Sequence, residues 1–172
     1  MIVVSDTNIL SSLAAAHSLV LLQELFKRST ISIPPAVRDE LQVAVDRGRT
    51  YLEPLVAAIT AGEIATLELT EEEQVLLTTL PRKLNAGERE AIVLCQQRRI
   101  PLLSNDRRAI RYCQASGIEV LDLATLLRLF WTQQITSRVE VEQIISRMEQ
   151  VERLALSAEQ RAAIFAPPRR RR

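Results

Sequence analysis

Histidine and cysteine are scarce in this sequence, and their scarcity excludes several kinds of active site. The one histidine, His17, lies on an apolar helical stretch, where a packed or partly exposed side chain is expected. A Ser-His-Asp or Cys-His nucleophile could be built only around this residue. The two cysteines, Cys95 and Cys113, are eighteen residues apart, which is not the ligand spacing of a zinc cluster.

Glycine-rich loops and long apolar runs are also missing. The four glycines are scattered singly, so neither the dinucleotide-binding fingerprint nor a phosphate-binding P-loop is present. The richest apolar stretch, LAAAHSLVLLQELF, is interrupted by polar residues and is too short for a membrane span. The N-terminus does not resemble an export signal, and both cysteines lie in apolar helical patterns. We therefore expect a reduced, cytoplasmic protein with no membrane segment.

The charge of the chain is nearly balanced. The 172 residues include 22 basic and 21 acidic side chains, and four of the basic ones form the terminal run Arg169 to Arg172. Without that run the body has 18 basic and 21 acidic side chains, a net charge of −3. Proteins that handle nucleic acid usually carry a basic footprint, so a polyanion partner must be argued from a local site.

Strand and helix patterns alternate over most of the chain. Apolar runs of strand length occur at residues 1–6, 30–35, 63–69, 100–106 and 118–123. Helical periodicity occurs between them, at residues 12–28, 36–48, 51–60, 70–80, 85–99 and 107–117. This alternation predicts an α/β fold, in which a parallel sheet carries helices on both faces.

The end of the chain shows helical patterns only, at residues 123–135, 137–154 and 157–166. At 47% apolar and 25% charged residues the composition is that of a globular protein. The length suits one domain with its own core. We therefore predict a single domain over residues 1–166, with a core at 1–125, a helical extension at 126–166, and a basic tail at 167–172.

Carboxylates mark the places where a parallel sheet binds ligands. Asp6 and Asp106 directly follow two predicted strands, so both should face the crevice at the carboxyl ends of the strands. Glu40 lies in the helix after the second strand, and Glu88 lies in the first turn of the helix before the fourth. Each acid alone could be a turn residue, a helix cap or a solvated charge. Their joint placement favours a common site.

Four carboxylates in a small cleft repel one another unless a cation is present. Hard oxygen ligands of this kind suit Mg²⁺ or Mn²⁺. Such an ion polarises a phosphodiester and lowers the pKa of bound water, which supplies a nucleophile without any histidine. We therefore predict that Asp6, Glu40, Glu88 and Asp106 are catalytic and bind the metal.

Residues 85–92, NAGEREAI, contain two glutamates that the helix turns in different directions. Asn85 and Glu88 have the spacing of a capping box, which is one role open to Glu88. The helix face of Glu88 is small and apolar, however, so its carboxylate is expected to point inward and to need a metal or a partner. Glu90 diverges from it by about 200° and is expected to be a supporting group or a surface charge.

The segments VVSDTNIL, PPAVRDEL, LNAGEREAIVLC and LLSNDRRA, which contain the four acids in this order, resemble those of PIN-domain ribonucleases. That family includes VapC-type toxins, and the GEREAI variant is most similar to a less characterised PIN-like branch. The resemblance covers about residues 1 to 125. It implies a three-layer α/β/α fold, a five-stranded sheet of order 3-2-1-4-5, a Mg²⁺ or Mn²⁺ centre, and endonucleolytic cleavage of RNA. Asn8 and Ser104 would orient the carboxylates, unless they serve only as turn or cap residues.

Partners follow from the same resemblance. Arg107, Arg108 and Arg111 adjoin Asp106 and could contact RNA phosphates, or could form a solvated helix face. The C-terminal helices could support a homodimer or bind an antitoxin through the apolar side chains of Leu126, Leu129, Phe130, Ile144 and Met148, although core packing is the plainer use. The leading hypothesis is a metal-dependent endoribonuclease that acts as the toxin of a toxin–antitoxin pair. The rivals are a non-catalytic interaction module and a phosphatase or DNA nuclease that uses the same acids.

Overall fold

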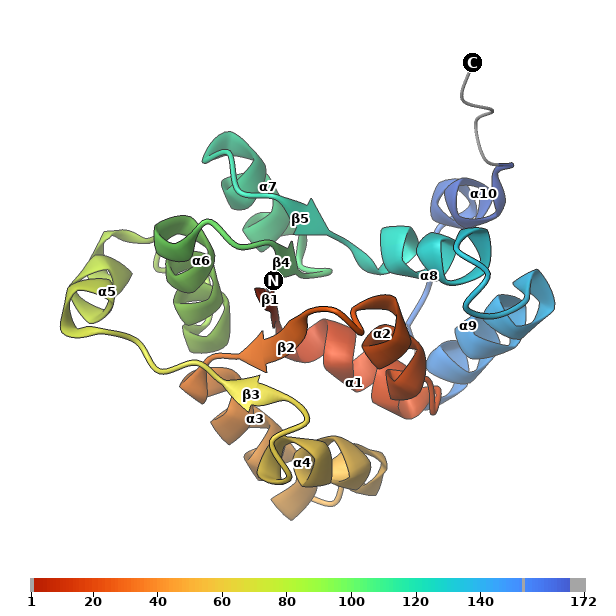
Figure 1. The fold of residues 1–172 in the computed structure, drawn as a ribbon, viewed down its shortest axis with the longest axis horizontal. Coiled ribbons are helices and arrows are strands. Elements are labelled where there is room, and N and C mark those ends of the chain that lie inside the picture. Colours follow the sequence, from red (N-terminus) through yellow and green to blue (C-terminus); the bar gives the residue numbers. More distant parts are fainter. Residues whose placement is uncertain (1, 153, 168–172) are drawn as a thin grey trace.

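Five short strands form one parallel sheet at the centre of the molecule. The computed structural model describes residues 2–152 and 154–167, so the arginine run of the predicted tail lies outside the described residues. The strands are β1 (Ile2–Ser5), β2 (Thr30–Ile33), β3 (Ala65–Thr66), β4 (Leu102–Leu103) and β5 (Val120–Leu121). They are arranged in the order β3-β2-β1-β4-β5, and all four pairings are parallel. The predicted α/β class and strand order are confirmed (Figure 1).

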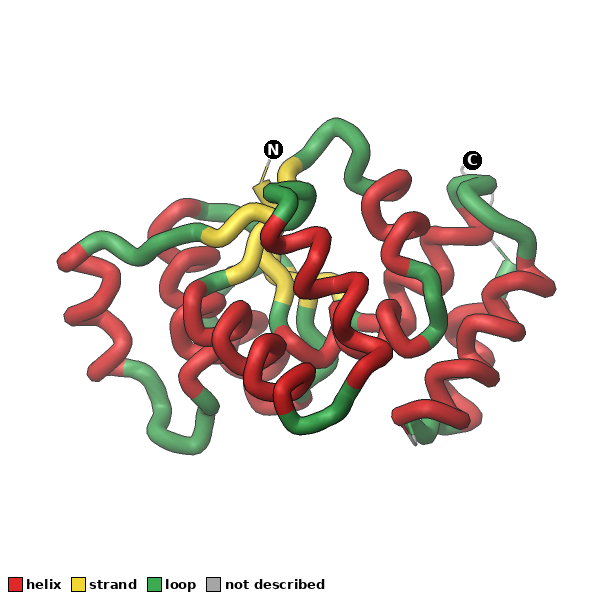
Figure 2. The backbone as a smooth tube through the Cα atoms, turned by 90° about the horizontal axis from the view of Figure 1, so that it is seen from below, coloured by secondary structure: helices red, strands yellow, loops and turns green. Residues whose placement is uncertain are grey.

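Helices surround this sheet along the whole chain. The α-helices up to β5 are α1 (Thr7–Ala15), α2 (Leu19–Leu25), α3 (Pro35–Asp46), α4 (Glu53–Thr60), α5 (Glu71–Leu76), α6 (Ala86–Arg98) and α7 (Arg107–Ala115). Two 3₁₀ turns, η1 (Thr50–Leu52) and η2 (Leu77–Thr79), precede α4 and follow α5. Figure 2 shows the strands in the middle, with helices on both sides of them. No helix of the described chain is long and apolar enough to cross a membrane.

The sheet separates two hydrophobic clusters because successive strand residues face opposite sides. Val3 of β1 packs into the cluster formed with α1, α3 and α4, whereas its neighbour Val4 packs into the cluster formed with α6 and α7. Leu103 and Leu102 of β4 divide in the same way. Burial on both faces explains why the strands read as continuous apolar runs in the sequence.

The last three helices, α8 (Leu123–Thr132), α9 (Arg138–Glu152) and α10 (Ala158–Phe165), lie together beside α1 and α2 (Figure 1). Their apolar side chains belong to the same cluster as Val3 of the sheet. Leu126, Phe130, Ile144 and Met148 are at most 1% exposed, and Leu129 is half-buried. The four buried side chains therefore complete the core and are not available to a partner surface.

The helix predicted over residues 12–28 is wrong in its extent. Helix α1 already begins at Thr7, and the chain breaks at His17, whose φ of 53° is left-handed. The Oγ atom of Ser18 donates to the carbonyl oxygen of Leu13, and helix α2 begins at Leu19. Periodicity did not reveal the break because apolar residues continue through it. The side chain of His17 is exposed, as its place at the break requires.

Candidate active site

Asp6 lies where β1 ends and α1 begins. Its Oδ1 atom accepts a hydrogen bond from the backbone N–H of Ile9 at 3.0 Å and so caps the helix. Its Oδ2 atom accepts one from the Ser104 hydroxyl at 2.6 Å. The side chain is 3% exposed, and this burial raises the pKa of Asp6 from 3.8 to about 6, against the lowering effect of those hydrogen bonds. Among the described residues, no positively charged side chain lowers the pKa of Asp6.

Ser104 connects Asp6 with Asp106. Strands β1 and β4 are neighbours, with Ser5 opposite Leu103, so the residues after both strands meet at one edge of the sheet. The Ser104 hydroxyl donates to Asp6 and accepts from the backbone N–H of Asp106 at 3.2 Å. Asp106 in turn begins α7, where its Oδ1 atom accepts from two backbone N–H groups. One buried hydroxyl thus joins the carboxylate of Asp6 to the backbone of Asp106.

Glu88 serves as a helix cap and also faces the other acids. Its Oε2 atom accepts from the backbone N–H of Asn85 at 2.9 Å, and the Asn85 side chain accepts from the N–H of Glu88 at 2.7 Å. Burial is the main cause that raises the pKa of Glu88, and the negative charges of Asp106 and Glu40 raise it further. The two roles proposed from the sequence are therefore compatible, because the cap uses only Oε2.

Glu40 reaches the cluster from α3. The Thr7 hydroxyl, next to Asp6, donates to the Oε2 atom of Glu40 at 2.7 Å. Helices α3 and α6 approach closely at Gly87, where a Cβ atom would lie 2.8 Å from the Cγ2 atom of Val37 and 3.7 Å from Oε2 of Glu40. The glycine before Glu88 is thus the residue that lets the two glutamate-bearing helices meet.

Glu90 has a structural contact instead of a place among the acids. Its Oε2 atom accepts from the backbone N–H of Ala36 at 2.8 Å, in the first turn of α3. Pro34 and Pro35 provide no side-chain cap there, and a carboxylate near a helix N-terminus is favourable. Glu90 therefore supports the helix that carries Glu40.

A small cavity of about 10 Å³ lies among the acids, with Asp6, Glu40 and Glu88 in its lining together with Asn8. This is about the space of one water-sized probe. Within the described residues no three Asp, Glu, His or Cys side chains form a ready-made metal cage. Mg²⁺, however, is commonly held by one or two carboxylates and completes its shell with water and substrate phosphate. The oxygen donors suit such an ion, and the cavity has room for one atom of that size.

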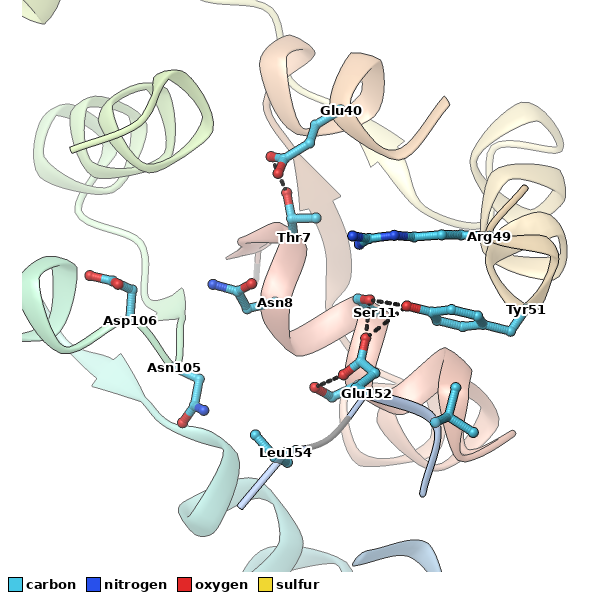
Figure 3. Close-up of a pocket in the computed structure, with 12 residues that line it drawn as sticks. Thr7, Asn8, Ser11, Glu40, Arg49, Tyr51, Asn105, Asp106, Glu152 and Leu154 are labelled. Atoms are coloured by element: carbon cyan, nitrogen blue, oxygen red, sulfur yellow. Dashed lines mark hydrogen bonds between the residues drawn. The ribbon is translucent and has the colours of Figure 1, made fainter. Parts of the chain in front are cut away.

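A larger cavity of about 580 Å³ adjoins the acids. Glu40 and Asp106 line it on one side, and Arg49, Tyr51 and Glu152 line it on the other (Figure 3). The carboxylate of Glu152, at the end of α9, accepts hydrogen bonds from the hydroxyls of Ser11, Ser12 and Tyr51. The cavity is therefore bounded by the N-terminal part of the chain and by the C-terminal helices.

Several residues of this region had no clear signal in the sequence. Thr7 follows Asp6 and could have been considered with it, but Glu152 looks like any exposed helix charge and Arg49 like any loop arginine. Of the three arginines predicted to contact RNA, none lines the large cavity. Arg108 is near enough to lower the pKa of Glu88, and its guanidinium donates to the carbonyl of Lys83.

Comparisons with known proteins show the family and the fold of the chain. A family model described as a PIN domain, DUF3368, matches residues 2–166. The fold is similar to a chain in the crystal structure of VapBC2 from Rickettsia felis bound to a DNA fragment from their promoter, with a TM-score of 0.56 and 16% identity. That likeness covers 71% of this chain and 98% of the other. The search of curated proteins gave no match. Because the family model spans nearly the whole sequence, the chain belongs to the PIN-domain family.

Proposed function

We propose that the protein is an endoribonuclease that depends on Mg²⁺ or Mn²⁺. PIN domains are generally nucleases, which gives the reaction class. The observation that carries the finer proposal is the atom-sized cavity lined by Asp6, Glu40 and Glu88, two of which have raised pKa values. A divalent cation there would offset the cost of burying these carboxylates, which is the main cause of the raised pKa values, and also the smaller repulsion between them. The described part of the chain has no histidine at this place, so the carboxylates are the groups that can take part in the reaction.

Asp6, Glu40, Glu88 and Asp106 would hold the ion, directly or through water. When bound, the ion would polarise the phosphodiester and lower the pKa of a water molecule. The chain's own contribution is the fixed position of the ligands. The Ser104 hydroxyl orients the carboxylate of Asp6, and the Thr7 hydroxyl orients that of Glu40. The carboxylate of Asp106 is oriented by the backbone N–H groups at the start of α7. Asn8 also lines the small cavity, and its amide would help to orient the carboxylates there.

We also propose that the protein is the toxin of a toxin–antitoxin pair in the cytoplasm. The similarity to a chain of VapBC2 supports this assignment, since that structure holds VapBC2 on a promoter DNA fragment. The antitoxin would bind a surface other than the buried face of the C-terminal helices. A homodimer is part of the same proposal, and analytical ultracentrifugation of the chain with and without its antitoxin would measure both associations.

The test of the activity is cleavage of a mixed RNA pool by the purified protein with Mg²⁺, with Mn²⁺ and with EDTA. We expect cleavage with either metal and none with EDTA. Asp106→Asn should abolish cleavage while the far-ultraviolet circular dichroism stays unchanged. The same protein is assayed on DNA and on a phosphomonoester. No cleavage of RNA by folded protein refutes the proposal, and absence of divalent binding by calorimetry would indicate a non-catalytic module.

A further inference from the structure

The large cavity beside the acids contains one cationic side chain. Of the residues that line it, only Arg49 is basic, whereas Glu40, Asp106 and Glu152 are acidic. Arg49 lies in the loop between α3 and η1, and its side chain extends into the cavity (Figure 3). The cavity volume of about 580 Å³ is within the usual range of small-ligand sites.

The guanidinium of Arg49 has no partner among the described residues of the protein. Within residues 2–152 and 154–167 it makes no hydrogen bond and no ion pair, although three carboxylates line the same cavity. Those carboxylates already have other donors. Thr7 donates to Glu40, and three hydroxyls donate to Glu152. An exposed guanidinium with free N–H groups is suited to an anion that enters from solvent.

The wall opposite the acids is fixed by the contacts of Glu152. Its two carboxylate oxygens accept from Ser11 and Ser12 of α1 and from Tyr51 of η1. These contacts join residues about 100 to 140 positions apart in sequence, so they hold the end of α9 against the loop that carries Arg49. The cavity is therefore a built feature of the fold, with Arg49 in its lining beside the acids.

We infer that Arg49 binds the phosphate of the nucleotide next to the cleaved bond of a single-stranded RNA. This assignment rests on the proposed function and adds to it a residue that binds and positions the substrate. RNA is a polyanion and is repelled by four carboxylates, and a cation beside them offsets this repulsion. The same cation fixes the position of the RNA along the site, because it binds one particular phosphate. The amides of Asn8 and Asn105 line the same cavity and can hydrogen-bond the sugar or base of that nucleotide.

The test compares Arg49→Ala with Arg47→Ala in an Asp6→Asn background, which prevents cleavage. Arg47 is an exposed residue of the same loop and does not line the cavity. Arg47→Ala therefore removes the same charge as Arg49→Ala without changing the cavity. The probe is a fluorescein-labelled single-stranded RNA of random sequence, and its affinity is measured by anisotropy at several salt concentrations. We expect Arg49→Ala to weaken binding about tenfold. It should also lower the slope of log K against log salt by about 0.7, the value for one phosphate contact.

Arg49→Lys separates charge from geometry. The lysine keeps the charge and loses the planar fork, so it should retain the salt slope and recover part of the affinity. In the cleavage-competent protein, Arg49→Ala should raise KM more than it lowers kcat, because the contact is made before and during the reaction. A structural defect would lower kcat and the melting temperature as well.

The inference is overturned if Arg49→Ala and Arg47→Ala have equal affinities and equal salt slopes. That result would stand even if the parent protein cleaves RNA, so it leaves the proposed function intact. Conversely, a parent protein that binds RNA through Arg49 but never cleaves it with Mg²⁺ or Mn²⁺ refutes the nuclease and retains the phosphate contact. Failure of the protein to bind the RNA at all refutes the contact.

Discussion

Replacing Asp6 by asparagine should stabilise the metal-free protein. Asp6 is buried, and its pKa rises from 3.8 to about 6 because burial disfavours the charged form. At 1.36 kcal/mol for each pKa unit, the rise corresponds to about 3 kcal/mol lost when the carboxyl ionises in the folded state. Asparagine removes this charge at nearly constant volume. The asparagine NH₂ group cannot accept the hydrogen bond that the backbone N–H of Asn105 gives to the carboxylate. The gain in stability is therefore at most about 3 kcal/mol.

The effect should depend on pH in a defined direction. The folded-state pKa of Asp6 lies above the unfolded value, so the stabilising contribution of its protonated form is complete below pH 3.8 and lost as pH rises through about 6. The advantage of Asp6→Asn should therefore be largest above pH 7 and should shrink toward pH 4. For a chain of this size, each 1 kcal/mol corresponds to about 2–4 °C in Tm.

The assay is thermal unfolding in EDTA across this pH range, followed by the same scan with Mn²⁺. Asp46→Asn is the control, because Asp46 is an exposed residue of α3 and its replacement removes the same charge as Asp6→Asn. Mn²⁺ should raise the Tm of the parent protein and of the control, but should raise that of Asp6→Asn far less. A metal-free Asp6→Asn protein that is less stable than its parent at neutral pH, or a difference independent of pH, would refute the reasoning.

Three further changes test the supports of the site. Gly87→Ala places a Cβ atom 2.8 Å from the Cγ2 atom of Val37, so denaturant unfolding should show a net loss of about 1 kcal/mol after the helix gain of alanine. Val37→Ala removes this contact but leaves a cavity in the core, so the loss in the double variant should be smaller than the sum of the two single losses. Glu152→Ala leaves the hydroxyls of Ser11, Ser12 and Tyr51 without their acceptor and should cost about 1–3 kcal/mol, and an unchanged unfolding midpoint would argue against this network. Glu90→Ala removes the acceptor of the Ala36 N–H and should cost about 1 kcal/mol, measured in the same way against Glu71→Ala as an exposed control.

The sequence predicted the sheet well because apolar runs and helical periods alternate along the chain. It could not predict how short β3, β4 and β5 are, because the apolar residues beyond each ladder are also buried in loops or helix starts. The break at His17 was missed for a similar reason. A left-handed residue leaves no mark in hydropathy when both flanking segments are apolar.

Three of the acids were predictable because Asp6 and Asp106 directly follow strands and Glu88 lies in the first turn of a helix. Glu40 lies about one and a half turns into the helix that follows β2, which brings it to the same edge of the sheet. Their geometry does bring Glu88 near Asp106 and Glu40. Arg49 and Glu152 could not be predicted, because the packing of α9 against α1 and η1 decides their position and no local pattern encodes it. The metal-binding role of the acids remains a prediction that the contacts support.

The most direct test of the central claim is a crystal structure of the protein soaked with Mn²⁺ and measured at the manganese absorption edge. An anomalous peak is expected in the small cavity between Asp6, Glu40 and Glu88, with at least two carboxylate oxygens at about 2.0–2.2 Å, close to the Mg²⁺ ligand distance. The Asp6→Asn crystal should lack that peak. A peak elsewhere in the protein, or no peak in well-ordered crystals of the parent, would contradict the assignment of these acids as metal ligands.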